Sequence, residues 1–423
     1  MTKESKSAVA PMRRFPDFNG SALREVQLSD VTAESAIRNG DRLPFTSVMG
    51  VTKGEGIVPM VERIIASDIA RYKIVQRDWF AYNPMRLNIG SIARWQGQAD
   101  ILVSPDYVVF QCLDGSDPGI CSSYLDHFRQ SVAWNAFVRE GGDGGVRIRI
   151  YFKDLGRLPL VLPPHAEQQK IADCLTSLDE VIAAQGRKVK ALKSYKRGLM
   201  QQLFPRQGEA LPRLRFPVFR NAPVWGNRVL GQMTSKVGSG ITPLGGDKNY
   251  KAHGRPFVRS QNVGWGELLL NDVAYISEET HRSFDSTEIQ ENDVLLNITG
   301  ASIGRSAVAD SRIVGGNVNQ HVCIIRAKVD ELNPVLLNQF LISARGQKQI
   351  EGFQAGGNRQ GLNFAQIRSF EIPLAPTERE QLRIADCLSS LDAGVVAEIA
   401  KLETLKSHKK GLMQQLFPSP EEA

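Results

Sequence analysis

Two stretches of the sequence recur and determine its architecture: Ile171-Ala-Asp-Cys-Leu175 returns as Ile384-Ala-Asp-Cys-Leu388, and Gly198-Leu-Met-Gln-Gln-Leu-Phe-Pro205 returns as Gly411-Leu-Met-Gln-Gln-Leu-Phe-Pro418. Both second copies lie 213 positions after the first, and the segment from Pro163 to Pro205 aligns with its repeat without a gap. An internal repeat of this length indicates that one structural unit occurs twice in the fold. Since different sequence precedes each copy, the chain is predicted to alternate two variable regions with two repeated segments.

Each repeated segment is predicted to be one long helix. Its seam residues step alternately by four and three positions, the period of a coiled coil. The seam comprises Ile171, Leu175, Leu178, Ile182, Gln185, Val189, Leu192, Lys196, Leu199 and Leu203 in the first copy, and Ile384, Leu388, Leu391, Val395, Glu398, Leu402, Leu405, Lys409, Leu412 and Leu416 in the second. Polar residues stand at the same two places in both seams, and such residues fix the register of one defined partner. The two helices are therefore expected to pair with each other; the alternative is that each packs separately on its own domain.

The later half of each helix is basic. The cations are Arg187, Lys188, Lys190, Lys193, Lys196 and Arg197 in the first copy, and Lys401, Lys406, Lys409 and Lys410 in the second. A run of charges is usually a solvated helix face, and cations also favour the negative end of the helix dipole. The functional alternative is contact with DNA phosphates or with an acidic partner surface.

The variable regions are predicted to be α+β domains built on irregular sheets. The predicted order is a domain at 14–160, a helix at 161–205, a domain at 206–372 and a helix at 373–418. Short runs rich in β-branched residues predict strands at 101–103, 107–111 and 146–152 in the first domain, and at 257–259, 294–298 and 321–325 in the second. Apart from their first residues, Arg14-Phe-Pro-Asp-Phe18 and Arg215-Phe-Pro-Val-Phe219, the two domains share little sequence. Two similar helices thus carry two dissimilar domains, which fits recognition of two different targets.

Composition narrows the class of protein. The 423 residues are 42% apolar and 23% charged, as in folded globular chains, and no apolar run is long enough to span a bilayer. Met1 to Ala10 is polar, so a cytoplasmic protein is expected. The five cysteines form no CxxC pair, which argues against a disulfide framework. A net charge of +7 permits a polyanionic partner such as nucleic acid.

Several motifs are recognisable along the chain. They are Gly238-Ser-Gly-Ile-Thr-Pro243, Arg259-Ser-Gln-Asn-Val263, Asp293-Val-Leu-Leu-Asn-Ile-Thr-Gly-Ala-Ser-Ile-Gly-Arg305, Gly361-Leu-Asn-Phe364 and the helix entry from Pro376 to Asp392, together with Tyr72-Lys-Ile-Val-Gln76 and Tyr82-Asn-Pro-Met-Arg-Leu-Asn-Ile-Gly90 in the first domain. With these motifs and the repeat, the sequence resembles the specificity subunit of type I restriction-modification systems over nearly its whole length.

The resemblance implies two target-recognition domains separated by an antiparallel pair of helices. Together the domains would read a bipartite, asymmetric DNA sequence across an unread spacer. It also implies two methyltransferase subunits as partners, with restriction subunits as a further addition. S-adenosylmethionine, ATP and Mg would then belong to those partners, and no cofactor is expected in this chain.

The residues themselves offer no sign of catalysis. The sequence lacks a phosphate-binding Gly-x4-Gly-Lys-Ser/Thr loop and an Asn-Pro-Pro-Tyr tetrad, so a self-contained modification enzyme would lack its methyl-donor site. The six histidines are scattered singly, and no metal site is predicted. The leading hypothesis is a non-catalytic DNA-recognition subunit. The alternative is a coiled-coil scaffold, or a DNA-binding adaptor, without base specificity.

Candidate DNA-contacting residues follow from the chemistry of base readout, in which Arg pairs with guanine and Asn or Gln with adenine, while Lys contacts phosphate. In the first domain they are Lys53, Arg77, Tyr82, Asn83, Arg86 and Arg94; in the second they are Lys248, Asn249, Tyr250, Arg259, Gln261, Asn262, Asn358 and Arg359. The glycine-rich loop around Arg359 could equally be an ordinary hairpin.

Overall fold

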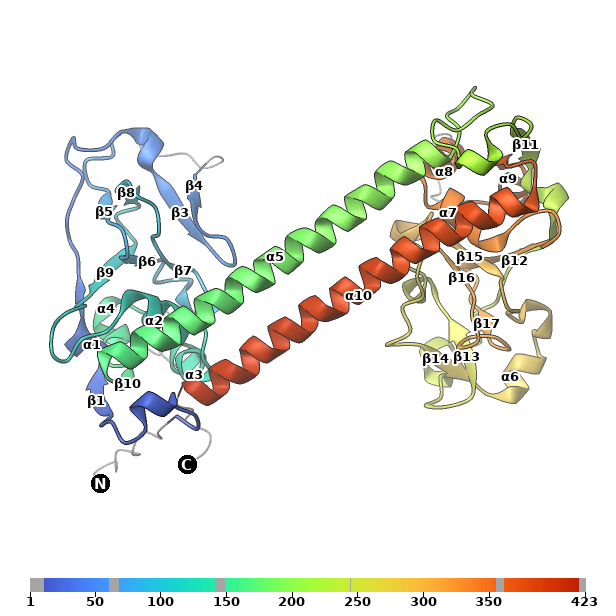
Figure 1. Cartoon of the computed structure of the whole chain (residues 1–423). Coiled ribbons are helices and arrows are strands. Elements are labelled where there is room, and N and C mark those ends of the chain that lie inside the picture. The colour runs from blue at the N-terminus through green and yellow to red at the C-terminus, as the bar shows by residue number, and fades with distance from the viewer. Residues whose placement is uncertain (1–10, 61–67, 141–148, 244, 355–360, 418–423) are drawn as a thin grey trace. The chain divides into compact units, whose positions relative to one another are not determined.

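The computed structural model describes residues 11–60, 68–140, 149–243, 245–354 and 361–417, which divide into two compact units (Figure 1). Unit 1 comprises residues 1–185 and 401–423, and unit 2 comprises residues 186–400. Each unit contains one strand-rich domain and part of both long helices, α5 (His165–Leu203) and α10 (Glu378–Leu416). Among the described helices, none is long and apolar enough to cross a membrane.

The domain of unit 1 is organised around a four-stranded antiparallel sheet in the order β2-β9-β6-β7. A separate pair, β1 with β10, lies next to the start of α5 in the sequence, and two further pairs are β3 with β4 and β5 with β8. The strands are β1 (Arg24–Gln27), β2 (Thr32–Glu34), β3 (Met49–Thr52), β4 (Gly56–Pro59), β5 (Lys73–Val75), β6 (Phe80–Tyr82), β7 (Ile92–Arg94), β8 (Ile101–Val103), β9 (Val108–Cys112) and β10 (Pro159–Leu162). The helices are η1 (Pro16–Phe18), α1 (Leu28–Val31), η2 (Phe45–Ser47), η3 (Leu87–Ile89), α2 (Ser122–Phe128), α3 (Val132–Glu140) and α4 (Phe152–Leu155).

The domain of unit 2 is organised around a sheet in the order β12-β18-β15-β16, beside a smaller sheet β14-β13-β17 and a pair β11 with β19. The strands are β11 (Gly226–Val229), β12 (Thr234–Ser239), β13 (Arg255–Val258), β14 (Ala274–Ile276), β15 (Val294–Asn297), β16 (Ser306–Val308), β17 (Asn317–Val318), β18 (Val322–Ala327) and β19 (Glu371–Leu374). The helices are η4 (Pro217–Phe219), η5 (Leu230–Met233), η6 (Gly246–Asn249), η7 (Ser260–Asn262), α6 (Glu278–Arg282), η8 (Asp285–Thr287), η9 (Gly300–Ser302), α7 (Pro334–Leu341), α8 (Ala344–Gln354) and α9 (Phe364–Arg368).

The two domains share one topology although their sequences differ. In chain order β2, β6, β7 and β9 build the first main sheet, and β12, β15, β16 and β18 build the second with equivalent neighbours. Short helices follow each sheet, and a strand paired with the first strand of the domain then leads into the long helix. The dissimilarity expected from the sequence therefore applies to the side chains and to the insertions between these strands, and not to the common sheet.

The long helices pack against each other within each unit. In unit 1 the core includes Ile171 and Leu175 near the start of α5 and Leu416 at the end of α10. In unit 2 it includes Leu203 at the end of α5 and Leu388 near the start of α10. The beginning of one helix thus packs with the end of the other in both units, which is an antiparallel relation. All twenty predicted seam residues, ten on each helix, are buried or half-buried.

The phenylalanine of each repeated Phe-Pro end packs into the apolar core of a domain. Phe417 packs edge-on against Tyr124 and Phe128 of α2, with ring centroids 5.3 and 5.5 Å apart. Its repeat equivalent, Phe204, packs against Phe340 of α7 at 5.7 Å. Since α2 and α7 occupy equivalent places in the two domains, the repeated aromatic residue attaches each helix end to a domain in the same way.

One predicted strand is wrong. Of the segment 146–152, residues 146–148 lie outside the described part, Ile150 belongs to no strand, and Phe152 begins α4. The Ile150 N–H donates to the Pro84 carbonyl at 3.0 Å and its side chain is fully buried. The alternating apolar pattern that predicted a strand thus reflects the burial of Ile150, which does not pair with another strand. The other five predicted strands are present, with ends shifted by at most two residues.

Candidate nucleic-acid interface

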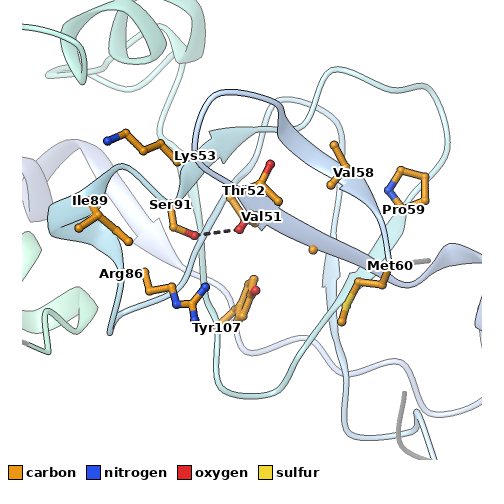
Figure 2. Close-up of a pocket in the computed structure, with 11 residues that line it drawn as sticks. Val51, Thr52, Lys53, Val58, Pro59, Met60, Arg86, Ile89, Ser91 and Tyr107 are labelled. Carbon is orange, nitrogen blue, oxygen red and sulfur yellow. Dashed lines mark hydrogen bonds between the residues drawn. The ribbon is translucent and has the colours of Figure 1, made fainter. Parts of the chain in front are cut away.

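The first domain has a surface cavity of about 380 Å³ (Figure 2). Its lining comes from the β3–β4 hairpin, the loop between β6 and β7, and Tyr107: Gly50, Val51, Thr52, Lys53, Val58, Pro59, Met60, Arg86, Ile89, Ser91 and Tyr107. The Ser91 hydroxyl donates to the Val51 carbonyl at 2.9 Å and ties the hairpin to the loop. Gly54 and Gly56 have φ of +92° and +72°, backbone conformations that side chains rarely adopt, and they allow the tight hairpin turn.

Two of the sequence candidates, Lys53 and Arg86, line this cavity and are exposed. In Figure 2 they lie at one end with Ile89, while Val58, Pro59 and Met60 lie at the other. A cation beside an apolar wall can contact phosphate or the guanine edge while the wall contacts a thymine methyl group. We call this set the Lys53 cavity.

The remaining accessible candidates of the first domain are already engaged in the free chain. Arg77 is exposed and donates to the Gln98 side chain at 2.9 Å. Arg94 pairs with Asp78 at 3.2 Å and with Asp126 at 3.4 Å, which marks it as a structural cation. Asn83 accepts a hydrogen bond from the Met85 N–H at 2.9 Å and shapes the loop that bears Arg86.

Tyr82 and Asn262 are corrections to the candidate set, because both are buried. Tyr82 lies on a central strand with its ring fully buried edge-on against Phe110, and burial raises the pKa of its phenol. Asn262 is 1% exposed; its carbonyl accepts the Arg259 N–H, and its amide donates to the Leu269 carbonyl. Both side chains are structural, so neither can reach a base in this conformation.

In the second domain three predicted residues come together around Asp272. The Arg259 guanidinium stacks over the Tyr250 ring at 5.3 Å and donates to the Asp272 carbonyl at 2.7 Å. The Gln261 amide donates to the Asp272 carboxylate at 2.6 Å. Asp272 is 80% exposed, so the group opens to solvent on that side. We call Tyr250, Arg259, Gln261 and Asp272 the Asp272 cluster.

The other predicted residues of this domain are placed unevenly. Lys248 and Asn249 are exposed on the short helix η6, close in sequence to Tyr250. Asn358 and Arg359 lie outside the described residues. The sequence interpretation missed Asp272, because an isolated aspartate in a loop carries no local signal. It also missed Trp265, an aromatic side chain that is 52% exposed between two glycines.

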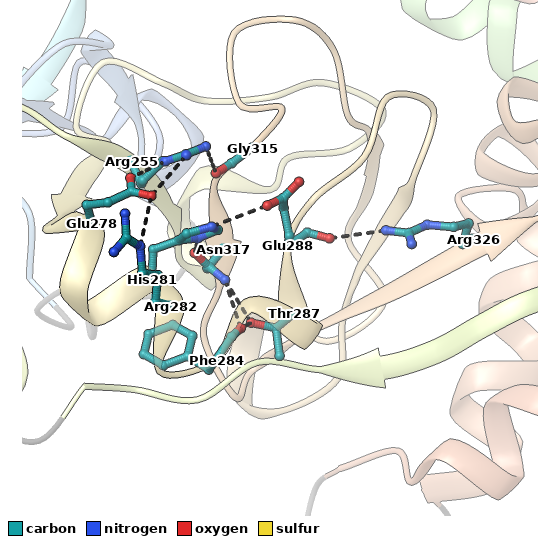
Figure 3. Close-up of polar contacts among 10 residues, drawn as sticks. All are labelled: Arg255, Glu278, His281, Arg282, Phe284, Thr287, Glu288, Gly315, Asn317 and Arg326. Atoms are coloured by element: carbon teal, nitrogen blue, oxygen red, sulfur yellow. Dashed lines mark hydrogen bonds and ion pairs between the residues drawn. The ribbon is translucent and has the colours of Figure 1, made fainter.

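A buried polar network supports this part of unit 2 (Figure 3). The side-chain oxygen of Asn317 meets His281 Nδ1 at 2.7 Å, and its amide donates to the Phe284 carbonyl and to the Thr287 hydroxyl. Arg326 donates to the Glu288 carbonyl and pairs through two hydrogen bonds with buried Asp293. Because Asn317 stands on β17 beside β13, whose end carries Arg259, the network fixes the strand next to the Asp272 cluster.

Comparisons with known proteins agree with this architecture. Residues 227–407 match the family model described as the type I restriction modification DNA specificity domain. This part of the chain is therefore similar to that domain family. The match runs from β11 through the second domain into α10.

Two relatives come from Methanocaldococcus jannaschii. One, described as a type I restriction enzyme MjaX specificity subunit, is 23% identical over 362 residues, covering 84% of this chain and 81% of the relative. The type I restriction enzyme MjaVIII specificity subunit is 21% identical over 268 residues, covering 62% of this chain and 61% of the relative. The resemblance recognised from the sequence motifs is thus confirmed.

Solved structures show the same fold. The S subunit of a type I restriction-modification system from M. genitalium matches with a TM-score of 0.60 at 12% identity, over 97% of this chain and 100% of that one. A chain from a structural study of the assembly and conformational transition of the type I R-M system matches with a TM-score of 0.57 at 18% identity, over 96% and 99%.

Proposed function

We propose that this chain is the DNA-recognition subunit of a type I restriction-modification complex and that each domain reads one half of a bipartite, asymmetric target. One observation carries the proposal: two domains of the same topology, each joined to a repeat-related helix, expose different side chains. Because the two domains have the same topology, each can approach its half-site in the same way. Because their exposed side chains differ, the two half-sites that they read should differ in sequence.

The exposed groups suit this task. Direct readout needs bidentate donors and acceptors, and phosphate contacts need cations. The Lys53 cavity offers Lys53 and Arg86 beside an apolar wall, whereas the Asp272 cluster offers Arg259 and Gln261 beside a carboxylate. A carboxylate can accept a hydrogen bond from the cytosine amino group. Among the residues that the structure describes, the lining of the Lys53 cavity contains no carboxylate.

Chemistry is assigned to partner subunits. We propose two methyltransferase subunits that modify adenine, with restriction subunits as an addition, and we place S-adenosylmethionine, ATP and Mg on those partners. Support comes from the duplication, because each unit presents the same helix junction once and would accept one copy of the same partner. The chain alone is expected neither to bind S-adenosylmethionine nor to methylate DNA; turnover by the purified chain would contradict this assignment.

The test uses the complete chain co-expressed with its methyltransferase in a host that has no other DNA methylation. Sequencing of methylated positions gives the target of the wild type, of a Lys53→Ala/Arg86→Ala variant and of a Lys248→Ala/Gln261→Ala variant. The first variant is expected to relax one half-site and the second the other, so each serves as the control for its partner. Discrimination should fall by about 1–3 kcal/mol for each bidentate side chain–base pair that the substitutions remove.

The result also separates this proposal from the scaffold alternative. A scaffold without base specificity would bind cognate and random DNA equally and would leave the methylated sequence unchanged in both variants. Relaxation of the same half-site by both variants would contradict the assignment of one half-site to each domain.

A further inference from the structure

Three side chains of different ligand chemistry converge in unit 1. Asp114 follows β9, Cys121 precedes α2, and His165 is the first residue of α5. Their ligand atoms all lie within 4.8 Å of one another. Cys121 Sγ lies 3.1 Å from His165 Nε2, and the Asp114 carboxylate contacts the same nitrogen. Short sequence motifs do not reveal this site, because the three residues are widely spaced along the chain.

The geometry distinguishes a ligand set from a proton relay. In a nucleophile–histidine–carboxylate relay, the carboxylate holds one ring nitrogen while the nucleophile contacts the other. Here the thiol and the carboxylate both contact Nε2. One ring nitrogen carries either one proton or one lone pair, so it cannot serve both groups as a relay would. Three donor atoms of different ligand chemistry within 4.8 Å of one another form an arrangement that a cation can bind.

We propose that Asp114, Cys121 and His165 bind a zinc ion and leave its fourth position to water. Thiolate sulfur, imidazole nitrogen and carboxylate oxygen are the ligands of protein zinc sites, and three protein ligands plus water is an established combination. Cys121 is 1% exposed, whereas His165 and Asp114 are about half exposed. The ion would therefore rest on a buried sulfur and face solvent on its open side.

The ion would fasten a loop to the helix. Gln168 on α5 already holds this loop, since its carbonyl accepts the Cys121 N–H at 3.0 Å and its amide donates to the Gly119 carbonyl at 3.1 Å. In unit 2 the repeat-related Gln381 makes the same two contacts, to the Asn333 N–H and the Glu331 carbonyl. There Asn333 takes the place of Cys121, and position 378, the repeat equivalent of 165, is a glutamate. The zinc site is therefore specific to unit 1.

The experiment uses the full chain, stripped with a chelator and titrated with Co²⁺ as a spectroscopic substitute for zinc. One equivalent should produce a thiolate-to-cobalt charge-transfer band together with intense visible bands of four-coordinate cobalt, and added Zn²⁺ should remove both. Cys121→Ser should abolish the thiolate band, and His165→Ala should weaken affinity at least tenfold. Cys174→Ser is the matched control, since it removes a thiol of α5 outside the cluster and should leave the spectrum unchanged.

Two outcomes would overturn the proposal. One is saturation of the folded wild-type chain without a thiolate band, a result that does not depend on any variant folding. The other is an unchanged band in Cys121→Ser whose circular dichroism equals that of the wild type. Zinc measured by mass spectrometry in the chain as purified should be close to one ion per chain, and it should fall in Cys121→Ser but not in Cys174→Ser.

Discussion

The same ion pair stands at the domain–helix junction of both units, but its surroundings differ. In unit 2 Arg215 binds Glu380 through two hydrogen bonds of 2.7 Å and also donates to the Ala222 and Pro223 carbonyls. Glu380 accepts a further bond from the Trp225 indole at 3.2 Å. In unit 1 the corresponding Arg14 and Glu167 have one additional partner among the residues that the structure describes, the Ser21 carbonyl.

A second repeated ion pair, between a lysine and an aspartate of the two long helices, has a different neighbouring side chain in each unit. Lys196 pairs with Asp392 at 2.6 Å in unit 2, and Lys409 pairs with Asp179 at 2.6 Å in unit 1. The Gln339 amide donates to Asp392 at 2.8 Å, whereas the equivalent neighbour of Asp179 is His127, 3.8 Å away. A repeated ion pair therefore acquires its properties from neighbours that are not repeated.

The largest difference in stability between the two units is expected when the arginine of each junction, Arg14 or Arg215, is replaced. Arg215→Ala should destabilise the chain by about 3–5 kcal/mol, because it leaves the fully buried Glu380 carboxylate without its cation. Arg14→Ala should cost less, since the Arg14 side chain is more exposed, at 15% against 8%, and makes fewer bonds. Urea unfolding of both variants measures the difference. Equal losses would mean that the extra bonds of Arg215 contribute nothing, and the conservative Arg215→Lys should recover only part of the loss because lysine cannot bind in a bidentate way.

A smaller difference is expected from the seam lysines, which are replaced by methionine to keep their apolar stems. Lys196→Met leaves Asp392 with the hydrogen bond from Gln339. Lys409→Met leaves Asp179, among the residues that the structure describes, with only His127 at 3.8 Å. Each loss should be about 1–2 kcal/mol, discounted because both aspartates are partly exposed, and Lys409→Met should lose more. The same urea measurement decides, and a larger loss for Lys196→Met would show that Gln339 does not compensate.

The long helices could be predicted from sequence because their evidence is local and periodic, with each seam residue visible from Ile171 to Leu416. The sheets were harder. Strands of three or four residues such as β6 carry a weak pattern, and their partners lie far along the chain. This is why the sequence alone makes Tyr82 a DNA-contacting candidate, whereas its place on a central strand puts the ring in the core.

The candidate site shows the same limit. Arg259 and Gln261 were found because base-reading residue types cluster within one short segment. Asp272, which both of them contact, was missed because only the folded loop brings it near. Likewise, the spacing of Asp114, Cys121 and His165 carries no signal, and their proximity arises only when α5 packs on the loop after β9. Local chemistry is thus readable from sequence, while convergence of distant residues requires the fold.

The smallest expected effect is the pH dependence of stability that His127 contributes in unit 1. Gln339 takes its place in unit 2. Burial lowers the pKa of His127 from 6.5, and nearby Lys409 lowers it further, with Arg94 adding a little; Asp179 and Asp126 oppose this shift. The unfolded chain therefore binds the proton more readily than the folded chain does. It follows that this contribution to stability is complete above pH 6.5 and declines as the pH falls below it.

His127→Gln copies the neighbour found in unit 2 and should remove this part of the pH dependence, as shown by urea midpoints measured above and below pH 6.5. Lys409→Met should weaken the dependence without abolishing it, because burial remains the main cause of the lowered pKa. The reciprocal variant, Gln339→His, places an imidazole beside Lys196 in a similarly buried position, and it should give unit 2 the acid sensitivity of unit 1. If His127→Gln retains the full pH dependence while Gln339→His adds none, the neighbours of the repeated pair do not set its response to pH, and other titrating groups must do so.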